Sequence, residues 1–442
     1  MAKTKLKYVC EFCGAEHAKW AGKCSACGSW NTLVQFREST EISGKGGQVL
    51  EAQPVASIET ESSNRLKTNH KDLDELLGGG IVPGSVILVA GEPGIGKSTL
   101  LLQIAEAIAG SGEILYASGE ESAGQISLRA KRLGAKSDNL KVVNSNSADD
   151  IATSIAKGKF TMAVVDSIQT VSLAGVASAP GTVSQITNSL SVLSRQAKAS
   201  RTALVVVGHV TKDGSIAGPK LLEHLVDVVL YFEGDRLGGF RILRTEKNRF
   251  GSTNESAIYE MNDKGLEPVA NPSEALLKER QVSDGSVVLA TMQGSRPLLV
   301  EVQALVNTTH FGYPKRAGSG IDVNRLNLLV AVLGKRTKLN LADKDIYVNV
   351  VGGIKLIDPG ADLAICMAIA SAAKGMKLKD DAVVFGEVGL SGELRHVSFI
   401  EKRAKEAQKL GFSYSIGPGA GQIAGYKPVK DLRQALNTYL SK

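Results

Sequence analysis

Four of the five cysteines lie within the first 30 residues, as two pairs with two residues inside each pair. Cys10 pairs with Cys13 and Cys24 with Cys27, and the ten residues between the pairs let the chain return so that four thiolates meet. Four soft sulfur ligands favour a tetrahedral zinc ion (Zn²⁺) over other metals, although iron is chemically possible. The sequence therefore predicts a structural zinc site in a module that is too small to fold without its metal.

A second motif, GEPGIGKS, fits the pattern G-x4-G-K-[ST] between an apolar run at 86–90 and a helical pattern at 99–109. In such loops the backbone N–H groups bind a β-phosphate, the lysine neutralises β- and γ-phosphate oxygens, and the hydroxyl binds Mg²⁺. The sequence therefore predicts a site for ATP or GTP. The expected nucleotide contacts are Gly91, Glu92, Pro93, Gly94, Ile95, Gly96, Lys97, Ser98 and Thr99.

Carboxylates follow two further apolar runs. Asp166 ends the run 162–165, and we expect it to hold Mg²⁺ together with Ser98. The run 114–117 leads to Glu120 and Glu121, at a position where a carboxylate can orient water for attack on the γ-phosphate. Glu120 is our candidate for the catalytic base, and Glu121 is the second choice.

These residues need a scaffold, and the spacing of the apolar runs indicates one. Strand-like runs at 86–90, 113–117, 162–165, 204–207 and 226–232 alternate with amphipathic segments. This pattern is typical of an α/β fold with a largely parallel sheet. Before it stands a polar stretch that we interpret as a linker, and after residue 271 a second α/β pattern begins. The expected domains are 1–37, a linker at 38–64, 65–270 and 271–442.

The overall composition narrows the class of protein. The chain has 442 residues, of which 43% are hydrophobic and 22% charged, which excludes a mainly disordered or fibrous protein. No apolar run is long enough to span a bilayer, and the first residues lack the apolar core of a signal peptide. We therefore expect a cytoplasmic protein with no membrane contact. The net charge of +7 is compatible with a polyanionic partner.

Two longer motifs connect the chain to a known family. The segment LDELLGGGIVPG at 73–84 precedes the phosphate loop, and the tract KNRFG stands at 247–251. With the four cysteines, these motifs resemble the bacterial RadA (Sms) family of DNA repair proteins along essentially the whole chain. The resemblance implies a RecA-like P-loop ATPase core, an N-terminal four-cysteine zinc ribbon and a C-terminal domain similar to the Lon protease.

The activity implied by the resemblance is that of a DNA-dependent ATPase that acts on intermediates of homologous recombination. The resemblance also implies that its subunits form a hexameric ring. Its expected partners are single-stranded and branched DNA, the RecA recombinase and further copies of the chain. It would extend heteroduplex in RecA-made D-loops by branch migration. Loops at 170–182 and 212–220 would line a DNA channel, and His209 would sense the γ-phosphate.

Lys247 and Arg249 follow a late strand of the core. RecA-like enzymes present cations there to a neighbouring subunit's nucleotide, so both are candidate catalytic residues that stabilise γ-phosphate charge in trans. A direct contact with DNA is the open alternative.

The C-terminal resemblance raises a second possible activity, since Lon is a Ser/Lys-dyad peptidase. In this chain Asp362 takes the place of the serine and Glu401 the place of the lysine, with Lys402 next to it. A carboxylate cannot form an acyl-enzyme, so we expect no peptidase activity and interpret the domain as an assembly unit. An ATP-dependent protease and a RecA-like nucleotide switch remain the alternative functions.

Basic residues suggest two further contacts. In the C-terminal domain they are candidates for DNA contact: Lys315, Arg316, Lys335, Arg336 and Lys338. In the zinc module, lysines accompany Trp20 and Trp30, and two interpretations stay open there, a nucleic-acid contact and a docking module.

Overall fold

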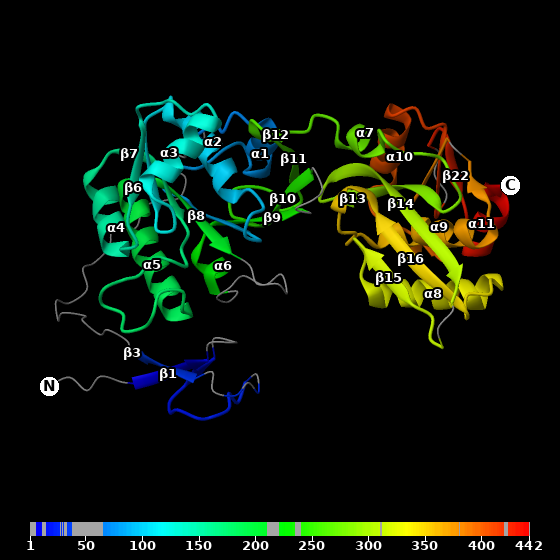
Figure 1. Cartoon of the computed structure of the whole chain (residues 1–442), viewed down its shortest axis with the longest axis horizontal. Coiled ribbons are helices and arrows are strands. Elements are labelled where there is room, and N and C mark those ends of the chain that lie inside the picture. The colour runs from blue at the N-terminus through cyan, green and yellow to red at the C-terminus, as the bar shows by residue number, and fades with distance from the viewer. Residues whose placement is uncertain are drawn as a thin grey trace, which may run out of the picture. The chain divides into compact units, whose positions relative to one another are not determined.

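The computed structural model describes residues 6–10, 15–26, 28, 30, 33–37, 65–209, 221–234, 240–309, 312–379, 381–419 and 423–441 (Figure 1). Several sequence predictions lie outside these residues, namely Cys13, Cys27, the linker at 38–64 and the loop at 212–220. The chain divides into two compact units, the first holding 1–233, 243–253 and 262–266, and the second 234–242, 254–261 and 267–442. The domain boundary at 270 stays a prediction.

The N-terminal module contains a small antiparallel sheet. Its strands β1 (Leu6–Cys10), β2 (Glu16–His17) and β3 (Leu33–Arg37) follow the order β2-β1-β3. Cys10 and Cys24 are each 1% exposed and cluster with Leu33. These three are the buried apolar side chains among the module's described residues, and a module of fewer than 40 residues is expected to need a metal for stability.

The first unit is built on a parallel sheet, as the alternating pattern predicted. The strands are β4 (Val86–Gly91), β5 (Glu113–Ser118), β6 (Leu140–Asn144), β7 (Phe160–Asp166), β8 (Ala203–His209) and β9 (Val228–Gly234). They run parallel in the order β9-β4-β8-β7-β5-β6. The sheet continues beyond β9 with β10 (Phe240–Asn248), β11 (Ser256–Asn262) and β12 (Gly265–Pro268).

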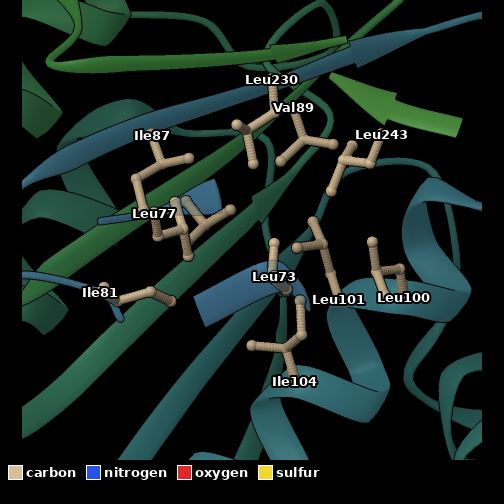
Figure 2. A pocket seen from close by; sticks show the side chains of 11 residues that line it. Leu73, Leu77, Ile81, Ile87, Val89, Leu100, Leu101, Ile104, Leu230 and Leu243 are labelled. Atoms are coloured by element: carbon tan, nitrogen blue, oxygen red, sulfur yellow. The ribbon is translucent and has the colours of Figure 1, made fainter. Parts of the chain in front are cut away.

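Helices connect the parallel strands. They are α2 (Lys97–Ala109), α3 (Ala123–Arg132), α4 (Ala148–Lys157), α5 (Val183–Ser200) and α6 (Leu221–Leu225). Helix α1 (Lys71–Leu76) precedes the first of these strands, β4. Side chains of α1 and α2 pack on β4, β9 and β10 through an apolar layer that includes Leu73, Leu101, Val89 and Leu230 (Figure 2). This layer anchors both ends of the segment that carries the phosphate loop.

The second unit contains a mixed seven-stranded sheet in the order β15-β16-β14-β13-β18-β21-β22. Its strands are β13 (Ser286–Gln293), β14 (Arg296–Thr308), β15 (Arg316–Ser319), β16 (Lys344–Val350), β18 (Ala382–Val384), β21 (Tyr414–Gly417) and β22 (Tyr426–Pro428). Two short pairs join β17 (Lys377–Leu378) with β23 (Leu440–Ser441), and β19 (Glu387–Val388) with β20 (Leu394–Arg395).

The described residues of the second unit also form the helices α7 (Pro272–Leu277), α8 (Val323–Thr337), α9 (Asp362–Lys374), α10 (Ile400–Lys409) and α11 (Leu432–Tyr439). Helix α9 is buried on all sides from Asp362 to Ser371, so it is the central helix of this unit. Within the described ranges, no helix combines the length and the apolar character needed to cross a membrane.

Candidate nucleotide-binding site

The phosphate loop lies between the end of β4 and the start of α2. Helix α2 begins at Lys97, two residues before the predicted pattern at 99, because Gly96 turns the chain with a φ of 116°. Gly94 has a φ of 79°, which L-side chains rarely adopt. A Cβ atom on Gly91 would lie 2.5 Å from the carbonyl oxygen of Phe232, so β9 leaves room only for glycine there. All the predicted nucleotide contacts, 91–99, thus belong to one strand–turn–helix junction.

Lys97 is buried and lies across its own loop. Its Nζ donates to the carbonyl oxygens of Gly91, at 2.8 Å, and Glu92, at 2.9 Å, and lies 3.2 Å from Nδ1 of His209. His209 is the last residue of β8, the neighbour of β4 in the sheet. The structure therefore brings the candidate γ-phosphate sensor into direct contact with the candidate phosphate-binding lysine.

Asp166 lies at the end of β7, where the sequence predicted a carboxylate. It is 7% exposed, and its Oδ2 accepts a hydrogen bond of 2.7 Å from the hydroxyl of Tyr116 on β5. Burial raises the pKa of Tyr116 well above 10.0, and the Asp166 carboxylate raises it further, so the hydroxyl keeps its proton and donates. Sequence reasoning missed Tyr116; its only signal was a polar hydroxyl inside an aliphatic strand.

Glu120 and Glu121 have different surroundings. Glu120 accepts a hydrogen bond from Oγ of Ser167 and lies 3.4 Å from Nε2 of His209. Glu121 forms an ion pair with Arg129 on α3 instead. A chain of contacts therefore runs from Lys97 through His209 and Glu120 to Ser167. Ser167 was also missed, although it directly follows Asp166.

Lys247 and Arg249 lie near the amino-terminal ends of the parallel strands, whereas the phosphate loop lies at their carboxyl-terminal ends. Nζ of Lys247 donates to the carbonyl oxygens of Glu223, at 2.7 Å, and Val226, at 2.8 Å. Burial, followed by the charge of Arg249, lowers the pKa of Lys247.

Arg249 donates to Asp227 at 3.1 Å, and the same carboxylate accepts from the N–H of Val86. Val86 is the first residue of β4, and the phosphate loop begins at Gly91, the last residue of the same strand. The Arg249–Asp227 pair and the phosphate loop are therefore about 16 Å apart along β4. The structure therefore does not bring either cation to the phosphate loop of its own subunit.

The two sequence motifs at 73–84 and 247–251 contact each other. Nδ2 of Asn248 donates to the carbonyl oxygen of Leu76 at 3.1 Å. A Cβ atom on Gly78 would lie 2.6 Å from the carbonyl oxygen of Phe250, and one on Gly251 would lie 2.8 Å from Cα of Gly78. The glycines of both motifs are therefore needed for this close backbone packing.

The described part of the zinc module fits a thiolate site. Cys10 and Cys24 come from different cysteine pairs yet lie in one buried cluster. Nε2 of His17 lies 3.4 Å from Sγ of Cys24. Cys13 and Cys27 would complete the ligand set.

The candidate dyad positions of the C-terminal unit have separate partners. Asp362 is buried, pairs through both oxygens with Arg325 and accepts from the N–H of Val388 at 3.1 Å. Burial raises the pKa of Asp362, and Arg325 offsets part of this effect. Glu401 is exposed on α10 and pairs with Lys405. Lys402 donates to the carbonyl oxygen of Ser295 at 3.3 Å.

Protein-family models match three parts of the chain. They are a rubredoxin metal binding domain at residues 8–35, an AAA domain at 52–215 and the ChlI subunit of Mg-chelatase at 327–420. A solved structure, that of the RadB recombinase, is similar at a TM-score of 0.38 with 24% identity, over 46% of this chain and 99% of that one.

Curated relatives match along the full length. The DNA repair protein RadA of Bacillus subtilis is 48% identical over 100% of both chains. That of Halalkalibacterium halodurans is 49% identical over 95% of this chain and 93% of its own, and that of Escherichia coli 43% over 98% of both. The expected three-part architecture is confirmed: a zinc ribbon, a RecA-like P-loop ATPase core and a Lon-protease-like α/β domain. The chain thus belongs to the family of the DNA repair protein RadA.

Proposed function

We propose that this chain is a DNA-dependent ATPase that processes recombination intermediates in DNA repair. One observation carries the ATPase part of the proposal, the chain of contacts from Lys97 through His209 and Glu120 to Ser167. The repair role is supported by the full-length similarity to proteins named DNA repair protein RadA.

In the proposed reaction, the ammonium of Lys97 leaves the carbonyl oxygens of Gly91 and Glu92 and binds the β- and γ-phosphate oxygens of ATP. Ser98 and Asp166 would hold the Mg²⁺, which would neutralise charge on the phosphates. Glu120 orients the attacking water, because its carboxylate is 41% exposed and is not committed to a cation in the way that Glu121 is.

His209 is the proposed link between nucleotide state and the rest of the core. It contacts Lys97 on one side and Glu120 on the other. When the lysine moves to a phosphate, His209 loses a partner and can turn toward the γ-phosphate. Because His209 ends β8, such a turn would be transmitted to the segment that follows, which is the expected DNA loop.

Lys247 and Arg249 are proposed to act in trans in a ring of subunits, with six as the number inferred from the family resemblance. Their position far from their own phosphate loop supports this assignment, since a catalytic cation there would have to act on a neighbour's nucleotide. Single-stranded DNA would pass through the ring, and hydrolysis would drive branch migration of RecA-made D-loops.

A peptidase function is not favoured. At the position of the serine, the carboxylate of Asp362 is bound to Arg325 and to a backbone N–H, and it offers no hydroxyl nucleophile. The C-terminal domain is therefore proposed as an assembly unit.

Steady-state ATP hydrolysis with and without single-stranded DNA tests the proposal, at low salt and again at higher salt. We expect stimulation that weakens as salt rises, because phosphate contacts release counterions. Hydrolysis that does not respond to DNA would contradict the motor and favour the nucleotide switch.

Mixing two inactive variants separates the roles of Arg249. A Lys97→Ala subunit lacks a working phosphate loop, and an Arg249→Ala subunit lacks the cation. If Arg249 acts in trans, mixed rings contain some complete sites and hydrolysis rises well above that of either variant alone. No recovery on mixing would assign Arg249 to DNA contact or to structure.

A further inference from the structure

The chain contains only two tryptophans, and both lie exposed on the zinc ribbon. Trp20 is 58% exposed and Trp30 is 70% exposed. Tryptophan normally buries most of its large apolar surface, so neither indole contributes much to a core here. Neither participates in the proposed ATP site, which leaves their exposure unexplained by the function described so far.

A tight turn brings the two indoles onto one patch. The N–H of Gly28 bonds the carbonyl oxygen of Cys24 at 2.9 Å, with a φ of 76° at Gly28, and the returning chain pairs Lys23 with Trp30. Both rings border Gly22, since a Cβ atom there would lie 3.8 Å from the ring of Trp30 and 4.0 Å from that of Trp20.

The surroundings of the patch are cationic. Nζ of Lys23 lies 5.5 Å from the ring centroid of Trp30, and Lys19 is exposed beside Trp20. The sequence from 17 to 37 contains no Asp or Glu, although acidic residues make up 45 of the 442 positions in the chain. The patch therefore offers flat aromatic surfaces with positive charge beside them, on a segment that has no acidic residue between positions 17 and 37.

We propose that Trp20 and Trp30 form a stacking platform for the bases of single-stranded nucleic acid, while Lys19 and Lys23 neutralise the adjacent phosphates. Bases stack on exposed indoles regardless of sequence, and flanking cations follow the backbone. This site goes beyond the proposed function, which places DNA in the ring formed by the ATPase core. A protein partner fits less well, because it would have to be both apolar and acidic at this patch.

Intrinsic tryptophan fluorescence is a specific probe of this patch. Because both tryptophans are on the ribbon, the intrinsic tryptophan fluorescence of the full-length, zinc-loaded protein reports on this patch alone. Titration with a 20-nucleotide oligo-dT at low salt should quench this emission, since stacking on an indole quenches its fluorescence. A duplex of the same length should quench it less, because its bases are already stacked.

Variants then identify the contributors. In Trp20→Ala and in Trp30→Ala the remaining tryptophan reports binding, and we expect oligo-dT affinity to fall about 5- to 100-fold. In Lys23→Gln the dependence of binding on salt should become less steep, by about 0.7 in the slope of log K against log salt. Tyr313→Ala, which removes a 90% exposed aromatic side chain outside the ribbon, is the matched control and should leave the quenching unchanged.

Zinc content, measured for every variant, identifies any variant whose ribbon fails to fold. Trp20→Phe and Trp30→Phe keep an aromatic ring and should retain most of the affinity. If oligo-dT leaves the tryptophan emission of the wild type unchanged, the proposal is overturned. The same holds if the alanine variants bind oligo-dT normally and lose only the binding of a protein partner.

The two proposals fail separately. The fluorescence titration needs no nucleotide and no hydrolysis, so a protein whose ATPase ignores DNA can still bind oligo-dT on its ribbon. Conversely, DNA-stimulated hydrolysis together with unquenched tryptophans would keep the motor and reject the platform.

Discussion

Two adjacent carboxylates in the proposed ATP site, Glu120 and Glu121, differ because of their neighbours. Ser167 and His209 contact Glu120, whereas Arg129 pairs with Glu121. Their order in the chain alone could not assign their roles, since the two are chemically identical. The partners come from β7, β8 and α3, elements that the chain reaches only later.

Replacing Glu120 by Gln should lower kcat for ATP hydrolysis by about 100-fold or more, because a general base typically contributes that much. The KM for ATP should change little, since the phosphate loop is untouched. Glu121→Gln is the matched control and should keep kcat within a few-fold of wild type. The reverse pattern in steady-state kinetics would move the base to Glu121.

Tyr116 orients Asp166 through a buried hydrogen bond. In Tyr116→Phe we expect Mg²⁺ affinity to fall about 10- to 100-fold, as is typical when the partner of a metal-binding carboxylate is lost. The measurement is the Mg²⁺ dependence of hydrolysis, together with Mn²⁺ binding to the ADP complex by electron paramagnetic resonance. Excess Mg²⁺ should restore kcat. An unchanged Mg²⁺ dependence would show that the hydroxyl serves stability alone.

At the scale of elements, the contact between the 73–84 and 247–251 segments holds the end of β10, which carries Lys247, and the turn after it, which carries Arg249. Gly78 has a φ of 75°, and its Cα faces the backbone of Phe250 and Gly251. A side chain at this position would push the two segments apart.

Gly78→Ala should therefore destabilise the core by about 1–3 kcal/mol, through backbone strain and the clash with the Phe250 carbonyl. Urea unfolding monitored by circular dichroism measures this change. Gly110→Ala is the control, because Gly110 has an ordinary helical φ of −67° and its nearest neighbour would lie 4.0 Å from the added Cβ. Equal stability of the two variants would refute the importance of the contact.

At the scale of the whole molecule, the zinc ribbon and the C-terminal unit are stabilised in different ways. The ribbon has a small buried cluster around Cys10 and Cys24, whereas the C-terminal unit has a large apolar core. That core also contains Arg403, which is 1% exposed and donates to Asp358 at 2.7 Å.

Replacing Cys24 by Ser should release the predicted zinc, because thiolate ligands provide most of the folding energy of so small a module. Atomic absorption measures the metal, and the tryptophan emission reports the loss of ribbon structure at the same time. Cys366→Ser is the control, since that thiol lies buried in α9, far along the chain from the ribbon. Full zinc content in Cys24→Ser would reject the ribbon site.

The pair of Asp358 and Arg403 should make the C-terminal unit sensitive to acid. Burial alone would raise the pKa of Asp358, but the Arg403 guanidinium and backbone N–H groups outweigh it and lower the pKa below 3.8. The pair therefore stabilises the folded state above about pH 4, and this contribution is lost as pH falls through the folded pKa.

Asp358→Asn should lower the free energy of unfolding by about 3–5 kcal/mol at pH 7, since it leaves a buried guanidinium without its charge partner. The deficit should shrink as the pH falls from about 4 through the lowered folded pKa of Asp358, because the wild-type carboxylate then becomes protonated too. Denaturant titrations at both pH values test this. Glu401→Gln, which removes an exposed carboxylate, should stay close to wild type at each pH, and a pH-independent deficit in Asp358→Asn would contradict the charge explanation.

Much of the architecture was predictable from the sequence, because the relevant signals are local. The phosphate loop depends on glycines and on the junction of one strand with one helix, and the metal site on two cysteine pairs close in the chain. Asp166 was predictable in the same way, as the last residue of a buried run. The fold class followed from the alternation of apolar strands with amphipathic helices.

Other features were decided only by the tertiary structure. Tyr116 meets Asp166 because β5 and β7 are neighbours in parallel register, and His209 meets Lys97 because β8 lies beside β4. Lys247 and Arg249 lie away from their own phosphate loop because their carboxylate and carbonyl partners precede the start of β9, whereas the phosphate loop follows the end of β4. Strand order and register join residues that are 50 to 112 positions apart, and no local spacing in the sequence records these contacts.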